Sequence, residues 1–68
     1  MSSALRAIED RGPGGWREIG LRNAAGELVA VVTRPQAGAA WFLHRASATR
    51  PERHPTRKAA IAAAARAP

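Results

Sequence analysis

Residues 16–46 have the sequence WREIGLRNAAGELVAVVTRPQAGAAWFLHRA, and this stretch decides the fold. Three segments in it have the length and apolar content of strands: Trp16–Asn23, Glu27–Arg34 and Ala39–Ala46. The β-branched density of the second segment favours a strand over a helix. The connections NAAG and PQAG contain residues that favour turns. The stretch therefore predicts a three-stranded antiparallel meander.

The sequence after this meander predicts a loop and then a helix. Residues 47–55, SATRPERHP, contain two prolines and no large apolar side chain, which is typical of a loop. A helix then begins at Pro55 or Thr56 and continues to about Ala67, with alanine at seven of its positions. Small alanine side chains would let this helix lie close against one face of the sheet.

The sequence before the meander predicts a second, short helix. In residues 2–11, SSALRAIEDR, either serine can act as the N-cap, and Leu5 and Ile8 would share one helical face. The run GPGG that follows would end this helix and make residues 1–15 a helix with a flexible linker. The predicted fold is thus a single α+β domain over residues 1–68, in the order α-β-β-β-α. Because the second and third strands have apolar residues on both faces, the N-terminal helix, a second copy or a partner would cover the remaining face.

Composition limits the size of the core. Apolar residues make up 46% of the 68, but 17 of them are alanine, so the larger side chains can form only one thin core. The absence of cysteine excludes disulfides and thiolate zinc sites. No apolar run approaches the roughly 20 residues that span a bilayer, and charges interrupt the N-terminal segment. We expect a cytoplasmic protein, either a marginally stable monomer or a dimer with a shared core.

Positive charge is the strongest functional signal. Eleven lysine and arginine residues against five acids give a net charge of +6. Residues 1–34 have five arginines and four acids, hence +1, whereas residues 35–68 have six cations and one acid, hence +5. A basic surface of this kind attracts polyanions to one end of a molecule. Arginine and alanine abundance from GC-rich coding is the alternative explanation, but it does not account for the asymmetry.

The candidate contact residues lie between the third strand and the last helix. Arg57 and Lys58 fall in the first turn of that helix, where cations oppose the helix dipole unless an anion binds there. A phosphate at this position would meet backbone N–H groups and two side-chain charges. The alternative is a solvated basic loop without a ligand. The predicted nucleic-acid contacts are Arg45, Arg50, Arg53, Arg57 and Lys58.

The segment TRKAAIAAAA, which starts at Thr56, resembles the beginning of the last helix in double-stranded-RNA-binding domains. That resemblance implies an α-β-β-β-α fold and recognition of duplex shape more than of sequence. It also implies that Arg57 and Lys58 contact phosphates, while Ala60, Ala63 and Ala64 pack on the sheet.

The predicted strand order is also similar to three-stranded-sheet DNA-binding modules of the integrase N-terminal and plant AP2 kind. Those modules lay the sheet in the major groove. Under this alternative the contacts would be Arg17, Arg22, Arg34 and Arg45.

The aromatic residues are few. Trp16 and Trp41 could stack on bases, but a small core needs its largest side chains, so packing is the preferred interpretation for both. Trp16 and Phe42 are also candidates for a partner interface, because Trp16 lies beside the Gly-rich segment and Phe42 is on the second face of its strand.

Enzymatic activity is not expected. The chain has two histidines, His44 and His54, and one aspartate, which is too few for a supported nucleophile–base pair or a metal site. We therefore expect neither catalysis nor a cofactor or metal. The sequence predicts a small nucleic-acid-binding module for DNA or RNA. The alternative is a protein-interaction module, such as a phage- or plasmid-type adaptor or inhibitor that docks on an acidic protein or a nucleoprotein. Homodimerisation is compatible with both, and membrane binding is not expected because the last helix has no bulky apolar face.

Overall fold

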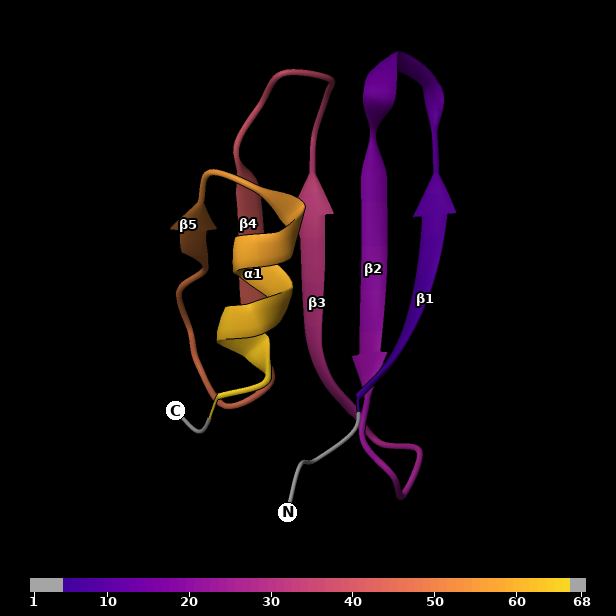
Figure 1. The fold of residues 1–68 in the computed structure, drawn as a ribbon, viewed down its shortest axis with the longest axis vertical. Coiled ribbons are helices and arrows are strands. Elements are labelled where there is room, and N and C mark those ends of the chain that lie inside the picture. Colours follow the sequence, from indigo (N-terminus) through magenta and orange to yellow (C-terminus); the bar gives the residue numbers. More distant parts are fainter. Residues whose placement is uncertain (1–4, 67–68) are drawn as a thin grey trace.

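The chain folds as an antiparallel meander in which each strand pairs with the next one, followed by one helix (Figure 1). The computed structural model describes residues 5–66. All four strand pairs are antiparallel, so the sheet has the order β1-β2-β3-β4-β5. A 3-10 turn at Pro13–Gly15 connects the first two strands. The elements are β1 (Arg6–Arg11), β2 (Arg17–Arg22), β3 (Leu28–Arg34), β4 (Trp41–Arg45), β5 (Glu52–His54) and α1 (Arg57–Ala64).

The core lies between one face of the sheet and α1. Alternation along the central strands sends every second side chain to this face, and the four largest fully buried side chains come from it. These are Ile19, Leu21, Val32 and Leu43. Two alanines of α1, Ala60 and Ala63, pack against them, since alanine lets a helix approach a sheet closely. Figure 1 shows α1 over β3, β4 and β5, while β1 and β2 extend beyond it.

At each end of α1, a side chain forms a hydrogen bond with a backbone group of the helix. The hydroxyl of Thr56 accepts a hydrogen bond from the backbone N–H of Ala59, at 3.0 Å, and so acts as the N-cap. At the other end, the Arg45 guanidinium donates to the carbonyl of Ala63 at 2.7 Å. Arg45 also pairs with Glu52, which fixes the guanidinium between β5 and the helix end. These contacts matter because an eight-residue helix is too short to be stable alone.

The central predictions are confirmed. The three expected strands correspond to β2, β3 and β4, and the expected C-terminal helix is α1, packed on one face of the sheet. The described helix ends at Ala64, and position 67 lies outside the described residues.

The predicted N-terminal helix is wrong for residues 6–11, which form strand β1; residues 2–4 lie outside the described range. The run GPGG is a connection between two strands rather than a helix end, and the N–H of Gly12 donates to the carbonyl of Trp16 at 2.9 Å. Pairing with β2 satisfies the backbone groups on one edge of β1 along its whole length. That long-range pairing outweighs the helical spacing of Leu5 and Ile8. The three-stranded order α-β-β-β-α is corrected accordingly.

The predicted loop over residues 47–55 is wrong at Glu52–His54, which form β5. This strand has no large apolar side chain, so hydrophobic patterning could not reveal it. Its residues pair with the outer edge of β4, where Glu52 lies opposite Leu43. The sheet therefore has five strands instead of three. Among the described residues, no helix has the length and apolar content to cross a membrane.

Candidate nucleic-acid interface

Strand pairing gathers three arginines into one row. Arg11 of β1 lies opposite Arg17 of β2, and Arg17 lies opposite Arg34 of β3. Directly opposite residues point to the same face of a sheet, with Cβ atoms roughly 5 Å apart. We call Arg11, Arg17 and Arg34 the arginine row. Like charges at such positions destabilise a sheet, so the row has a cost that other contacts must offset.

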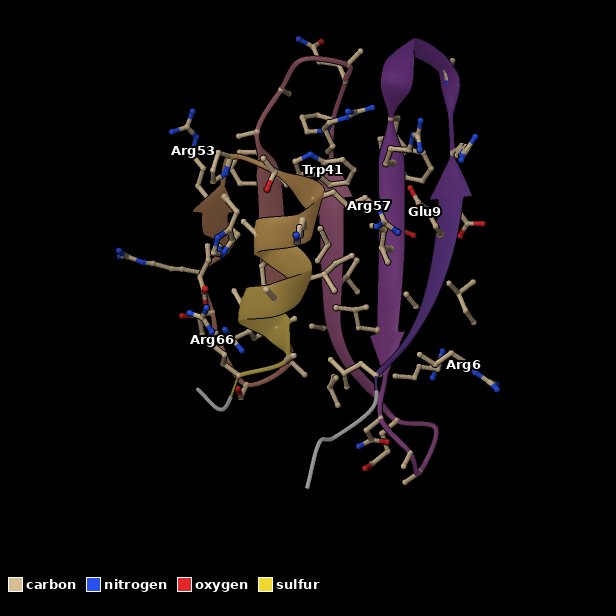
Figure 2. All side chains as sticks on the ribbon, viewed as in Figure 1. Arg6, Glu9, Trp41, Arg53, Arg57 and Arg66 are labelled. Carbon is tan, nitrogen blue, oxygen red and sulfur yellow. The ribbon has the colours of Figure 1, made fainter. Side chains whose placement is uncertain are left out.

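One carboxylate offsets part of this charge. Glu9 accepts a hydrogen bond from Nη1 of Arg17 at 3.1 Å and another from Nη2 of Arg57 at 2.8 Å. Figure 2 shows the Arg57 side chain reaching from the first turn of α1 toward Glu9 on β1. Partial burial by itself raises the pKa of Glu9, but the hydrogen bonds and charges of Arg57 and Arg17 outweigh it and lower the pKa. Glu9 is therefore ionised and shared by two cations.

The guanidinium of Arg34 is held by the ring of Trp41 and by the carbonyl of Gly15. Its guanidinium lies 4.9 Å from the centroid of the Trp41 ring, a cation–π arrangement. Its Nε and Nη2 donate to the carbonyl of Gly15 at 3.2 and 2.9 Å. Gly15 has a φ of +85°, and a Cβ there would come within 2.5 Å of the backbone nitrogen of Ala37. Only glycine fits this position, so the loop and Arg34 are fixed together.

The N-terminus of α1 extends the positive surface. Arg57 and Lys58 are exposed in its first turn, which has no acidic residue. Within residues 5–66, Lys58 and Arg11 have no ion pair or side-chain hydrogen bond. We call the arginine row together with Arg57 and Lys58 the basic cluster. Five cations against Glu9 leave a formal charge of +4 (5 − 1) in this cluster.

The predicted contact residues do not form one group. Arg57 and Lys58 belong to the basic cluster, but Arg45 is only 14% exposed and caps the end of α1. Arg53 lies on the outer strand β5 and points away from the helix (Figure 2). Arg50 is exposed in the connection that precedes β5. In the described part of the chain, Arg50 and Arg53 have no acidic partner.

The alternative sheet contacts are also divided between two places. Arg17 and Arg34 lie on the helix side of the sheet, in the arginine row. Arg22 lies on the other side, where its Nη1 donates to the carbonyl of Gly26 at 2.9 Å within the β2–β3 hairpin. The sheet face that would enter a groove is therefore not lined by all of these arginines.

The two tryptophans pack against the protein. Trp41 is 7% exposed and belongs to the core. Trp16 is half-buried, and its ring lies so close to Gly12 that a Cβ there would meet it at 2.6 Å. Phe42 is half-buried on the sheet face opposite α1. Among residues 5–66, neither tryptophan is therefore a fully exposed ring.

Sequence reasoning missed Arg11 and Glu9 as parts of this surface. It assigned both to a helix, where neither would meet Arg17 or Arg57. One signal was present, since GPGG between two short polar–apolar segments suits a strand connection as well as a helix end. The pairing register was not available from local patterns.

Both histidines contact polar side chains on neighbouring positions of the sheet. Nε2 of His44 lies 3.2 Å from the hydroxyl of Thr33, and Nε2 of His54 lies 3.4 Å from Glu52. Glu52 is itself paired with Arg45. Within residues 5–66 no three histidine, cysteine or acidic residues are grouped so that they could hold a metal ion.

Comparisons of this chain with protein-family models, with curated proteins and with solved structures found no match.

Proposed function

We propose that this protein binds the phosphate backbone of nucleic acid through the basic cluster. The observation that supports the proposal most directly is the register that puts Arg11, Arg17 and Arg34 side by side. Three like charges in adjacent strands are unfavourable for folding alone, and Glu9 neutralises only part of them. A bound polyanion would replace the repulsion among these arginines with attraction to the ligand.

The first turn of α1 supports the same ligand. Backbone N–H groups at a helix N-terminus and the positive end of the dipole favour anions. Arg57 and Lys58 add two side-chain charges at that place. Thr56 already satisfies one of the N–H groups, so the side chains and the dipole would supply most of the attraction.

Duplex backbone is the preferred form of the ligand. Single-strand binders use exposed aromatic rings on which bases stack. Here Trp41 is buried, and Trp16 packs on Gly12. Phosphate contacts without base stacking give affinity with little dependence on sequence.

The test is fluorescence anisotropy with labelled duplex DNA, duplex RNA and single strands. Five phosphate contacts predict that affinity falls roughly 500-fold between about 50 and 200 mM salt. Arg11→Ala with Lys58→Ala removes two cations that have no ion pair in the described structure, so the fold should be retained. This double variant should lose about tenfold or more in affinity, with a shallower salt dependence.

The matched control is Arg50→Ala with Arg53→Ala, which also removes two cations, one from β5 and one from the connection that precedes it. We expect it to weaken binding less than the first double variant. Equal losses would mean that net charge alone attracts the ligand and would refute the assignment to the basic cluster. No binding to any nucleic acid at low salt would refute the function and leave an acidic protein surface as the partner to test.

A further inference from the structure

The sheet face opposite α1 is uncovered and partly apolar. We call it the open face. Its middle row consists of Ile8, Gly20 and Val31, which lie opposite one another in three adjacent strands. Ile8 is 54% exposed and Leu28 is 46% exposed, and they are the only large apolar side chains that are exposed in residues 5–66. Both line one shallow hollow of about 220 Å³ on this face.

A bulge in β3 puts Leu28 on the open face. Arg22 pairs with Leu28 while Leu21 pairs with Ala30, so Val29 is an extra residue in the ladder. In a regular strand Leu28 would share the face of Ala30 and Val32 and would point into the core. Instead Val29 packs against the core and Leu28 is exposed. The bulge thus leaves an apolar side chain partly exposed on the open face, beside Gly20.

A like-charged pair of residues lies at each end of this face, and the two pairs have opposite signs. Asp10 lies opposite Glu18 at one end, and Arg6 lies opposite Arg22 at the other. Each pair puts like charges on neighbouring strands, which is unfavourable. No ion pair involves any of the four within the described residues. Along β1 and β2 the face is therefore acidic at one end, apolar in the middle and basic at the other end, while Arg53 of β5 lies on the same cross-strand row as Asp10 and Glu18.

We propose that a second copy of this chain covers the open face in a symmetric dimer. A two-fold axis that runs across the strands, along the middle row, stacks β1 of one copy on β1 of the other in opposite directions. Asp10 then faces the partner subunit's Arg6, and Glu18 faces the partner subunit's Arg22. Ile8 packs against the partner subunit's Ile8, and the interface is self-complementary, as two-fold symmetry requires.

The charge pattern selects this orientation over the other symmetric stacking. An axis parallel to the strands would place β1 over the partner's β5, so that Asp10 would face the partner subunit's Arg53 while Glu18 would face no cation. Arg6 and Arg22 would then have no acidic residue opposite them. Only the antiparallel stacking pairs both acids with both arginines.

The size of the face sets the expected strength. Five strands about 4.8 Å apart and about six residues of about 3.4 Å give a face of roughly 20 by 20 Å. Its area of roughly 400 Å² per copy is below the roughly 800 Å² per partner of a standard stable interface. The dimer is therefore weak, and its population depends on protein concentration. The basic cluster lies on the outer side of each copy, since α1 is on the face away from the partner.

Sedimentation equilibrium of the full chain tests the dimer from about 1 µM to 1 mM, the range in which weak dimers exchange with monomers. We expect the mean mass to rise from one chain toward two. Two charge variants then test the orientation: Asp10→Arg with Glu18→Arg, and Arg6→Glu with Arg22→Glu. In a dimer of either variant alone, residues of like charge face one another across the interface. The dissociation constant of each variant dimer should therefore be about tenfold higher or more than that of the natural chain.

A mixture of the two variants should restore association as a mixed dimer, because all four cross-subunit pairs then have opposite charges. Each variant keeps a like-charged pair at each position, as in the natural chain. Because Arg22→Glu also removes the hydrogen bond to the carbonyl of Gly26, circular dichroism checks that each variant is folded. A natural chain that stays monomeric up to 1 mM overturns the proposal. Dimerisation unaffected by the charge variants, or a mixture that associates no better than either variant, overturns the stacking.

Discussion

Glu9→Gln should weaken the fold and strengthen anion binding at the same time. In the structure Glu9 accepts hydrogen bonds from Arg17 and Arg57, which are the main compensation for the charge of the basic cluster. Glutamine keeps the shape and removes the charge. Solvent-screened ion pairs contribute about 0.2–1 kcal/mol each, so losing two should destabilise the protein by about 1 kcal/mol. For a domain of this size, that lowers Tm by roughly 4–8 °C.

The binding effect has the opposite sign because the cluster charge rises from +4 to +5. Affinity for duplex should increase severalfold at low salt and converge with that of the natural chain at high salt. Thermal unfolding followed by tryptophan fluorescence measures the first effect. Fluorescence anisotropy at two salt concentrations measures the second.

Asp10→Asn is the matched control. It makes the same change in net charge one residue away, on the opposite face of β1, and Asp10 has no ion pair among residues 5–66. We expect it to leave Tm unchanged or slightly higher, since it relieves repulsion from Glu18. If both variants change Tm and affinity equally, the contacts of Glu9 have no specific role and the reasoning about the basic cluster is refuted.

Three further predictions follow from the backbone and from the carboxylates. Gly15→Ala should destabilise the protein by roughly 2–5 kcal/mol, because the position combines positive φ with a backbone contact. Gly38→Ala has a similar φ and open space around the added Cβ, so it should cost about 1 kcal/mol. Equal effects of the two variants in urea unfolding would contradict the contact at Gly15. Thr56→Ala should remove about 1 kcal/mol of stability by the same assay, whereas Thr56→Ser should retain most of it; an unchanged urea midpoint in the alanine variant would argue against the cap. The pKa of Glu52 is lowered by the hydrogen bond from Arg45, and that of Glu9 is also lowered, so both stabilise the fold above about pH 4.5 and lose this contribution as pH falls through their lowered pKa values. Glu9→Gln should therefore flatten the acid side of the stability profile, and a profile identical to that of the natural chain would exclude this contribution.

Sequence by itself was sufficient for the parts of the fold that local patterns encode. Val29, Val31 and Val32 favour a strand because β-branched side chains suit an extended backbone, and the alanine-rich run after Thr56 favours a helix. The net positive charge also follows directly from composition. These features depend on residues that are close in the chain, so the three central strands and α1 were predicted within a few residues.

Tertiary structure alone decided the edges of the sheet and the composition of both candidate surfaces. β1 and β5 have too few apolar residues to be recognised as strands, and they exist because their backbones pair with β2 and β4. The same pairing puts Arg11 beside Arg17 and brings Glu9 to Arg57, which is 48 residues away in the chain. A single extra residue in β3 moves Leu28 from the core to the open face. Strand register is a property of two distant segments at once, and a one-residue change reverses which face a side chain occupies, so no local pattern can fix it.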